Sequence, residues 1–202
     1  MTLTSLRRGN AGWFTIKLAV AIISLAMKIL ALSGSLRQSS INTALLKAAA
    51  RLAPAEMKII VYSGLGELAL FNPDNEQNPP DRVKHFHSQV ATTDGIIIAS
   101  PEYAHGVTGT IKNALDWLVG FEAFAYKPVA VFNTSIRAYH AEEAIRETLR
   151  TMSATLLESN DFAIPLLTGT DEQTIITTPA TAASIQGALM SLYDLMLNYT
   201  NT

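Results

Sequence analysis

The loop from Gly34 to Asn42, with the sequence GSLRQSSIN, carries the residues best suited to binding chemistry. It follows an apolar run and opens a segment of helical spacing, so backbone N–H groups and the positive end of a helix converge on one spot. The polar side chains of this loop are Ser35, Arg37, Ser39, Ser40 and Asn42. Arginine offers a planar donor fork that matches phosphate oxygens. The loop therefore predicts a terminal-phosphate site, with helix capping by Ser40 or Asn42 as the alternative.

A second polar loop, residues 100–109, has the sequence SPEYAHGVTG. Pro101 sets a rigid turn, and Gly106 and Gly109 permit a flat ligand to approach the backbone closely. Tyr103 offers a ring face and a hydroxyl group. We therefore expect this loop to border a planar ligand. Three residues of the following segment are expected to pack and form hydrogen bonds rather than to act in catalysis: Asn113, Asp116 and Trp117.

Apolar runs alternate with segments of helical spacing from Met27 onward. The pattern predicts strands at residues 29–32, 57–62, 95–99 and 128–132, and a fifth within 155–164. It predicts helices at residues 42–52, 82–93, 111–118, 142–153 and 180–197. Such alternation is typical of a parallel sheet covered on both faces. Ligands bind these sheets at the carboxyl ends of the strands, which is where both polar loops are expected.

Together the two loops resemble those of the NADPH-dependent FMN reductase family, which includes quinone, chromate and azo-dye reductases. The matching motifs are G-S-L-R-x-x-S-x-N at residues 34–42 and P-E-Y…G…K-N-A-L-D-W at residues 101–117. The resemblance extends from residue 27 to about residue 200. It implies an α/β fold of the flavodoxin-like type. In that fold a doubly wound, five-stranded parallel sheet of order 2-1-3-4-5 has helices on both faces.

The resemblance also implies a bound FMN and NADPH or NADH as co-substrate. Ser35, Arg37, Ser40 and Asn42 would hold the FMN phosphate, while residues 101–103 would lie against the ring. Hydride would pass from NAD(P)H to flavin N5 and then to a quinone, a free flavin or a similar acceptor. No catalytic side chain and no metal are expected, because the flavin carries the chemistry. The complete expected cofactor-binding set is Ser35, Arg37, Ser39, Ser40, Asn42, Pro101, Glu102, Tyr103, Ala104, His105, Gly106, Thr134 and Ser135.

Two positions depart from the family pattern. Many members have Asn after P-E-Y, whereas this chain has Ala104 and then His105. Many also carry a glycine-rich loop after the fourth strand, whereas residues 133–140 read NTSIRAYH. Thr134 and Ser135 could still face the ring, and Arg137, Tyr139 or His140 could narrow the pocket or meet a nucleotide phosphate. The alternative function is a flavodoxin-like electron carrier, or a flavin-binding module without NAD(P)H reductase activity.

The composition excludes several other classes of protein. The 202 residues are 49% hydrophobic and 16% charged, which suits a folded domain with a core. A formal charge of −2 and 7% aromatic residues do not suggest a nucleic-acid partner. The absence of cysteine excludes disulfides, thiolate nucleophiles and cysteine-ligated metals. His85 and His87 are two residues apart and would face different sides of a helix, so no metal site is expected. No G-x-S-x-G elbow of a serine hydrolase is present.

Residues 1–26 form a separate compositional segment. They contain Arg7, Arg8 and Lys17, no acidic residue, and a short apolar run at residues 18–26. We predict an N-terminal extension at 1–26, either signal-like or a tail from an upstream start, followed by one FMN-binding domain at 27–202. The expected location is cytoplasmic, or exported if the segment is a signal, with membrane contact only if it is an anchor. The resemblance further implies a small-molecule electron acceptor and a homodimer or homotetramer.

Overall fold

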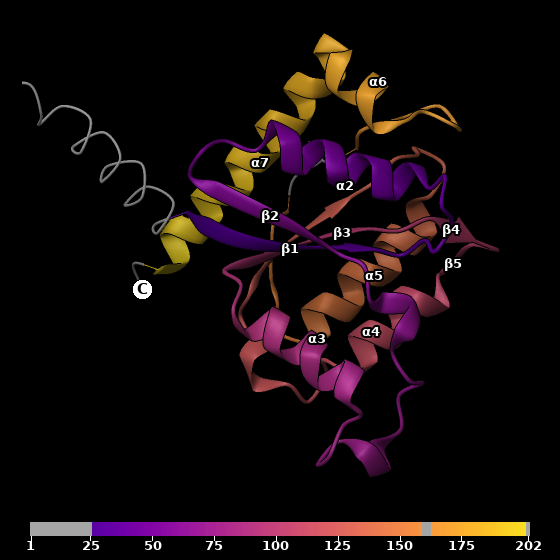
Figure 1. Ribbon diagram of the computed structural model, residues 1–202, viewed down its shortest axis with the longest axis vertical. Coiled ribbons are helices and arrows are strands. Elements are labelled where there is room, and N and C mark those ends of the chain that lie inside the picture. Colours follow the sequence, from indigo (N-terminus) through magenta and orange to yellow (C-terminus); the bar gives the residue numbers. More distant parts are fainter. Residues whose placement is uncertain (1–25, 159–162, 201–202) are drawn as a thin grey trace, which may run out of the picture.

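The computed structural model describes residues 26–158 and 163–200. Five parallel strands form the central sheet in the order β2-β1-β3-β6-β7 (Figure 1). Their bounds are β1 Met27–Ser33, β2 Met57–Tyr62, β3 Gly95–Ala99, β6 Pro128–Phe132 and β7 Thr155–Leu156. Counted along the chain within this sheet, these are the first to fifth strands. The predicted order 2-1-3-4-5 is therefore confirmed. β7 is short, and an isolated parallel bridge between Asn133 and Ala163 continues its pairing beside β6.

The strands alternate their apolar side chains between two hydrophobic clusters. Ile29 and Ala31 of β1 join one cluster, and Leu30 and Leu32 join the other. The first cluster includes residues of α2 Ile41–Leu52, α6 Glu172–Thr177 and α7 Pro179–Thr200. The second includes residues of α3 Asp81–Ala91, α4 Gly109–Asp116 and α5 Tyr139–Thr151. The sheet is therefore covered on both faces, as Figure 1 shows.

Three features were absent from the sequence prediction. The six-residue helix α6 is too short to show a helical period, so five helices were expected where the described chain has six α-helices. A two-stranded antiparallel hairpin, β4 Glu102–Tyr103 and β5 Gly106–Val107, follows β3. Single 3₁₀ turns also occur: η1 Leu65–Glu67, η2 Pro73–Asn75 and η3 Glu122–Phe124.

Side chains at the end of α4 form hydrogen bonds with the long loop between β2 and α3. Asn113 accepts a hydrogen bond from the Phe71 N–H at 2.8 Å and donates to the Ala69 carbonyl at 3.0 Å. The Trp117 Nε1–H donates to the same carbonyl at 2.7 Å. Asp116 pairs with Lys112 on the helix surface. The packing and hydrogen-bonding roles expected for these α4 residues are therefore confirmed.

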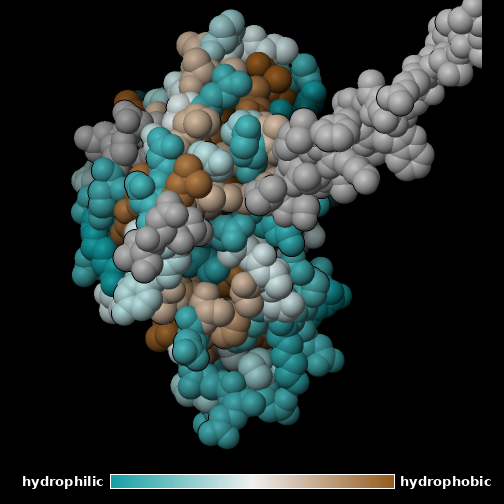
Figure 2. Space-filling model, turned by 90° about the vertical axis from the view of Figure 1, so that its left-hand side faces the viewer, coloured by the Kyte–Doolittle hydropathy of each residue, from teal (hydrophilic) through white to brown (hydrophobic). Residues whose placement is uncertain are grey.

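Figure 2 views the side of the molecule on which β1 begins. Its lower tip, which carries the loop around η2, is predominantly hydrophilic. Among the described residues, no helix combines the length and hydrophobicity needed to cross a membrane.

Candidate functional site

The candidate site lies where the loops after β1 and β3 meet. The strand order reverses between these neighbouring strands, and this is where doubly wound sheets bind ligands. Gly34 directly follows β1 and donates its N–H to the Ala99 carbonyl at 2.8 Å. A Cβ at Gly34 would lie 2.2 Å from Ser100 Oγ and 2.8 Å from Ile111 Cγ1. Only glycine lets the two loops approach this closely, so the motif glycine shapes the site.

The loop after β1 and the first turn of α2 line a cavity of about 220 Å³. Its lining includes none of the acidic residues and has one guanidinium, that of Arg37. The arginine is exposed, and among the described residues no carboxylate forms an ion pair with it. Five predicted phosphate residues line this cavity: Ser35, Arg37, Ser39, Ser40 and Asn42. This donor set fits an anionic phosphate group. We call this cavity the phosphate cavity, after its predicted ligand.

Two of these residues also serve the fold. Ser40 caps α2, because its Oγ accepts the Thr43 N–H at 3.2 Å. Its hydroxyl hydrogen remains able to donate to a ligand. Asn42 is 2% exposed, and its Oδ1 accepts a hydrogen bond from Thr134 Oγ1 at 3.3 Å. The capping alternative is thus confirmed for Ser40, whereas Asn42 links the first loop to the loop after β6.

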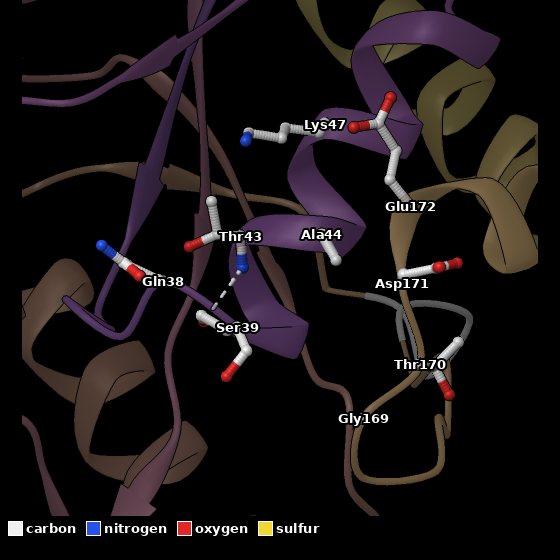
Figure 3. A pocket seen from close by; sticks show the side chains of 10 residues that line it. Gln38, Ser39, Thr43, Ala44, Lys47, Gly169, Thr170, Asp171 and Glu172 are labelled. Carbon is white, nitrogen blue, oxygen red and sulfur yellow. Dashed lines mark hydrogen bonds between the residues drawn. The ribbon is translucent and has the colours of Figure 1, made fainter.

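A neighbouring cavity of about 200 Å³ opens beside the phosphate residues and shares Ser39, Ser40 and Gly169 with the first. Figure 3 shows Gln38 and Lys47 on one side of it and residues 170–172 on the other. The carboxylates here have their own partners. Asp171 caps α6 by accepting the Thr174 N–H at 2.8 Å, and this hydrogen bond lowers the pKa of Asp171. Glu172 lies 3.4 Å from Arg51.

Residues 168–172 were not among the predicted site residues. The fifth strand, β7, has only two residues in the described chain, a length too short for the sequence pattern to indicate its register or the loop after it. Gly169, which lines both cavities, has a φ of 88°. The only sequence signal for this segment was Gly169 itself, because a glycine after a strand is typical of a loop.

A third cavity, of about 270 Å³, adjoins the phosphate cavity and shares Ile41, Asn42 and Pro101 with it. Its other walls come from the hairpin and from the loop after β6: Ser100, Glu102, Thr134, Ser135, Arg137 and Ala138. The tertiary structure therefore brings together the three loops that the sequence singled out. The phosphate cavity and this third cavity together suit a ligand with an anionic end and a flat end.

The β4–β5 hairpin turns through Ala104 and His105, which have φ values of 49° and 59°. Tyr103 pairs with Gly106 across the hairpin and is 57% exposed. Tyr103 also lines the phosphate cavity. The predicted residues Ala104, His105 and Gly106 line neither of the two adjoining cavities and lie on the hairpin beside them.

Glu102 is the most constrained side chain of this hairpin. Its Oε2 accepts the Ala141 N–H of the first turn of α5 at 2.9 Å, and its Oε1 lies 3.0 Å from His105 Nδ1. The pKa of Glu102 is lowered, first by the Ala141 N–H and further by the hydrogen bond from His105. The carboxylate is therefore held in its ionised form. The ring of His105 meets that of His140 edge to face, with centroids 4.6 Å apart.

A polar network holds the glycine-free loop after β6. Asn133 Oδ1 accepts the Ser135 N–H at 2.9 Å, and Asn133 Nδ2 donates to Glu142 Oε2 at 2.7 Å. Glu142 Oε1 in turn accepts from Arg146 Nε at 2.9 Å, and Arg146 is 8% exposed. Sequence reasoning did not identify Asn133, Glu142 or Arg146. The i,i+4 spacing of the two charged residues was the available signal.

The histidines of α3 have structural contacts. His87 Nε2 lies 2.8 Å from the Trp117 carbonyl, and its ring stacks on Phe121 with centroids 4.2 Å apart. His85 stacks on Tyr62. Within residues 26–158 and 163–200, no group of three or more His, Cys, Asp or Glu residues could hold a metal ion.

The sheet order and the position of the site define the chain as a flavodoxin-like α/β protein. A flavodoxin structure from the domain Archaea shares the fold, with a TM-score of 0.56 over 83% of this chain and 99% of that one, at 15% identity. The family model of NADPH-dependent FMN reductases matches residues 27–169, and the chain belongs to that family. The resemblance inferred from the two loops is therefore confirmed.

Several relatives carry names of reductases. A 2-hydroxy-1,4-benzoquinone reductase of Burkholderia sp. is 37% identical over 117 residues, which cover 56% of this chain and 63% of that protein. A quinone reductase of Escherichia coli K12 is 29% identical over 67% of this chain and 76% of its own length. The structure of FerB, a flavoenzyme NAD(P)H:(acceptor) oxidoreductase from Paracoccus denitrificans, has a TM-score of 0.72 and 25% identity, covering 86% of this chain and 98% of that one.

Proposed function

We propose that this protein is an FMN-dependent NAD(P)H oxidoreductase that reduces a quinone, a free flavin or a similar small acceptor. The adjoining cavities carry this proposal. One is free of carboxylates and lies at the start of α2, and the next is walled by the hairpin and the loop after β6. The family match and the relatives named quinone reductase support the reaction class.

The residues fit FMN by the chemistry of their donors. Ser35, Arg37, Ser39 and Ser40 would bind the phosphate, assisted by the positive end of α2. Pro101, Glu102, Tyr103, Thr134 and Ser135 would border the ring, with hairpin backbone amides at residues 104–106 facing its polar edge. The bound cofactor would supply hydride transfer from NAD(P)H to the acceptor. The protein would bind and orient the reactants.

The visible spectrum of the purified protein tests this proposal. We expect flavin absorption after loading with FMN, and anaerobic bleaching of that absorption when NADPH or NADH is added. Comparison of the two nucleotides gives the preference between them. A protein that neither retains FMN nor oxidises NAD(P)H in the presence of a quinone would contradict the proposal.

The alternative is an electron carrier that binds flavin but does not react with NAD(P)H. The departures at Ala104 and in the glycine-free loop favour it, because both alter the surroundings of the ring. The same spectrum separates the two functions. A carrier would keep its flavin oxidised in the presence of NAD(P)H and would be reduced by dithionite.

We also infer a homo-oligomer, either a dimer or a tetramer. Exposed apolar side chains occur on the segments that follow four strands of the sheet: Leu36, Tyr103, Ile136, Tyr139 and Leu167. Large exposed apolar patches usually mark interaction surfaces. Light scattering coupled to size-exclusion chromatography should give a mass of two or four chains. A cytoplasmic location is part of the same proposal, and fractionation of cells that express the full chain tests it.

A further inference from the structure

We propose that Arg137 gives this protein a preference for quinone acceptors that carry an anionic substituent, such as a sulfonate or a carboxylate. The inference rests on the proposed reductase function and names a class of acceptor for it. Arg137 lines the third cavity, in which a flat acceptor would lie against the ring of the bound cofactor. Its role is that of a specificity residue, without a part in hydride transfer.

Of the residues that line the third cavity, Glu102 and Arg137 carry a formal charge. Both carboxylate oxygens of Glu102 are engaged. Its Oε2 accepts the Ala141 N–H at 2.9 Å, and its Oε1 lies 3.0 Å from His105 Nδ1. The Ala141 N–H belongs to the first turn of α5, where the positive end of the helix stabilises a negative charge. The charge of Glu102 is therefore compensated within the protein.

The guanidinium of Arg137 has no such compensation. Its residue is exposed, and within residues 26–158 and 163–200 the guanidinium forms no ion pair or hydrogen bond. Arginine stays protonated throughout the pH range of a folded protein and offers a planar donor fork that matches anionic oxygens. An unpaired cation on a cavity wall raises the local concentration of anionic ligands. The third cavity therefore favours a ligand with a negative charge.

The backbone of the loop after β6 holds Arg137 at the cavity wall. Asn133 Oδ1 accepts the Ser135 N–H at 2.9 Å, and Ser135 Oγ accepts the Arg137 N–H at 3.3 Å. The Ser135 carbonyl accepts the Ala138 N–H at 3.0 Å, and α5 begins directly afterwards at Tyr139. The backbone position of Arg137 is thus fixed by a turn on one side and a helix on the other, while its side chain is free to contact a ligand.

Arg137 is the guanidinium left for a second ligand once the cofactor is bound. Arg37 lines the phosphate cavity and is assigned to the cofactor phosphate. An anionic group attached directly to a quinone enters the third cavity together with the quinone ring. In NAD(P)H, by contrast, a ribose separates the nicotinamide ring from the diphosphate. We therefore assign Arg137 to the acceptor, and the test includes both nucleotides.

The kinetic test compares an anionic and a neutral acceptor in the FMN-loaded full chain: 1,4-naphthoquinone-2-sulfonate and 1,4-naphthoquinone. In Arg137→Gln, the ratio of anionic to neutral kcat/KM should fall about three- to tenfold, a modest factor because the guanidinium is exposed. The intrinsic reactivities of the two quinones cancel, because every variant is measured with the same pair. The kcat/KM values for NADH and NADPH should stay at the wild-type level.

Two variants and a salt series control this test. Lys58→Gln removes the same charge near the amino end of β2, away from the carboxyl ends of the strands, and should keep the wild-type ratio. Arg137→Lys retains the charge and should keep most of the ratio. In the wild type, the ratio should fall as the ionic strength rises, because salt screens exposed charges. In Arg137→Gln, the ratio should depend little on salt.

A binding measurement on the FMN-loaded protein gives a readout without turnover. Isothermal titration calorimetry with naphthalene-2-sulfonate should show a dissociation constant that rises by the same factor in Arg137→Gln. 2-Naphthol, which is uncharged at neutral pH, should bind the wild type and the variant equally. A wild-type protein that reduces neither quinone with NAD(P)H would contradict the proposed function. The calorimetry would still decide whether Arg137 binds the anionic group.

Three results would overturn the inference. The first is an unchanged acceptor ratio in Arg137→Gln together with unchanged binding of the sulfonate. The second is an equal fall of the ratio in Lys58→Gln, which would show a general effect of net charge. The third is a loss confined to NADH or NADPH, which would assign the guanidinium to the nucleotide.

Discussion

Individual residues at the carboxyl edge of the sheet combine a structural role with a place in the cavity where phosphate binding is proposed. Ser40 caps α2 and also lines the phosphate cavity, and Asn42 joins two loops from a buried position. Arg37 differs from both, because its exposed guanidinium forms no ion pair with a described carboxylate. Its expected contribution is therefore to ligand binding rather than to stability.

Replacement of Arg37 by Ala should weaken FMN binding by about tenfold to 100-fold, because charge-assisted hydrogen bonds to phosphate are lost. Quenching of flavin fluorescence measures the dissociation constant. Arg82→Ala is the control: Arg82 is exposed on α3 and pairs with Glu67 at 2.9 Å. Equal affinities for Arg37→Ala and the wild type would remove the phosphate role.

Ala104 provides a second prediction at this scale. With a φ of 49°, its Cβ is in an unfavourable backbone region that Asn tolerates. Ala104→Asn should raise the free energy of unfolding by about 0.5–1 kcal/mol, measured by urea denaturation of the cofactor-free protein. Ala55→Asn, at an exposed position without positive φ, should give no such gain. A loss of stability at position 104 would show that turn strain is not the controlling factor.

At the scale of elements, α5 forms hydrogen bonds with two segments of the site, the hairpin and the loop after β6. Its first turn supplies the Ala141 N–H to Glu102, and Glu142 and Arg146 hold Asn133 in the loop after β6. Helix and loop are therefore coupled by side-chain hydrogen bonds. Disturbance of the helix should therefore reach the loop after β6, which lines the third cavity.

Arg146→Ala should destabilise the protein by about 2–4 kcal/mol, because Glu142 loses its buried partner. Arg146 also donates to the Leu157 carbonyl at 3.3 Å, so the start of the segment after β7 loses a contact. Arg150→Ala is the control on the same helix. Its ion pairs with Glu147 and Glu158 are exposed, and its effect should be much smaller. Equal effects in denaturation experiments would contradict the importance assigned to this network.

At the scale of the whole molecule, both hydrophobic clusters are composed of residues from position 27 onward within the described chain. β1 begins at Met27 and pairs with β2 and β3 from its first residues. The assignment of residues 27–202 to one domain and of residues 1–26 to an extension stays a prediction. The predicted extension lies outside the described residues except for Ala26.

If residues 1–26 are an extension, their removal should leave the thermal midpoint within about 2 °C of that of the full chain, because the described sheet begins with β1 at Met27. FMN affinity should also be unchanged. Differential scanning calorimetry and a fluorescence titration of both chains check this. A large drop in the midpoint would place the opening segment within the domain.

Much of the fold was predictable because its signals are local. The strands at 57–62, 95–99 and 128–132 were predicted to the residue, since continuous apolar runs of this length are bounded by turn residues. The helix expected at 142–153 begins at Tyr139 instead. Glu102, distant in the sequence, accepts a hydrogen bond from its first turn, and no local pattern records that contact.

The residue types and spacing of the two loops were sufficient to indicate a phosphate site, a flat-ligand site and the family. These properties depend on neighbours along the chain, on strand periodicity and on helix starts. The tertiary structure alone decided that Glu102 contacts His105, that Asn133, Glu142 and Arg146 form one network beside the loop after β6, and that Thr168 and Gly169 border the phosphate cavity. Side-chain hydrogen bonds and cavity walls join segments whose distance in space is set by packing of the whole sheet and its helices.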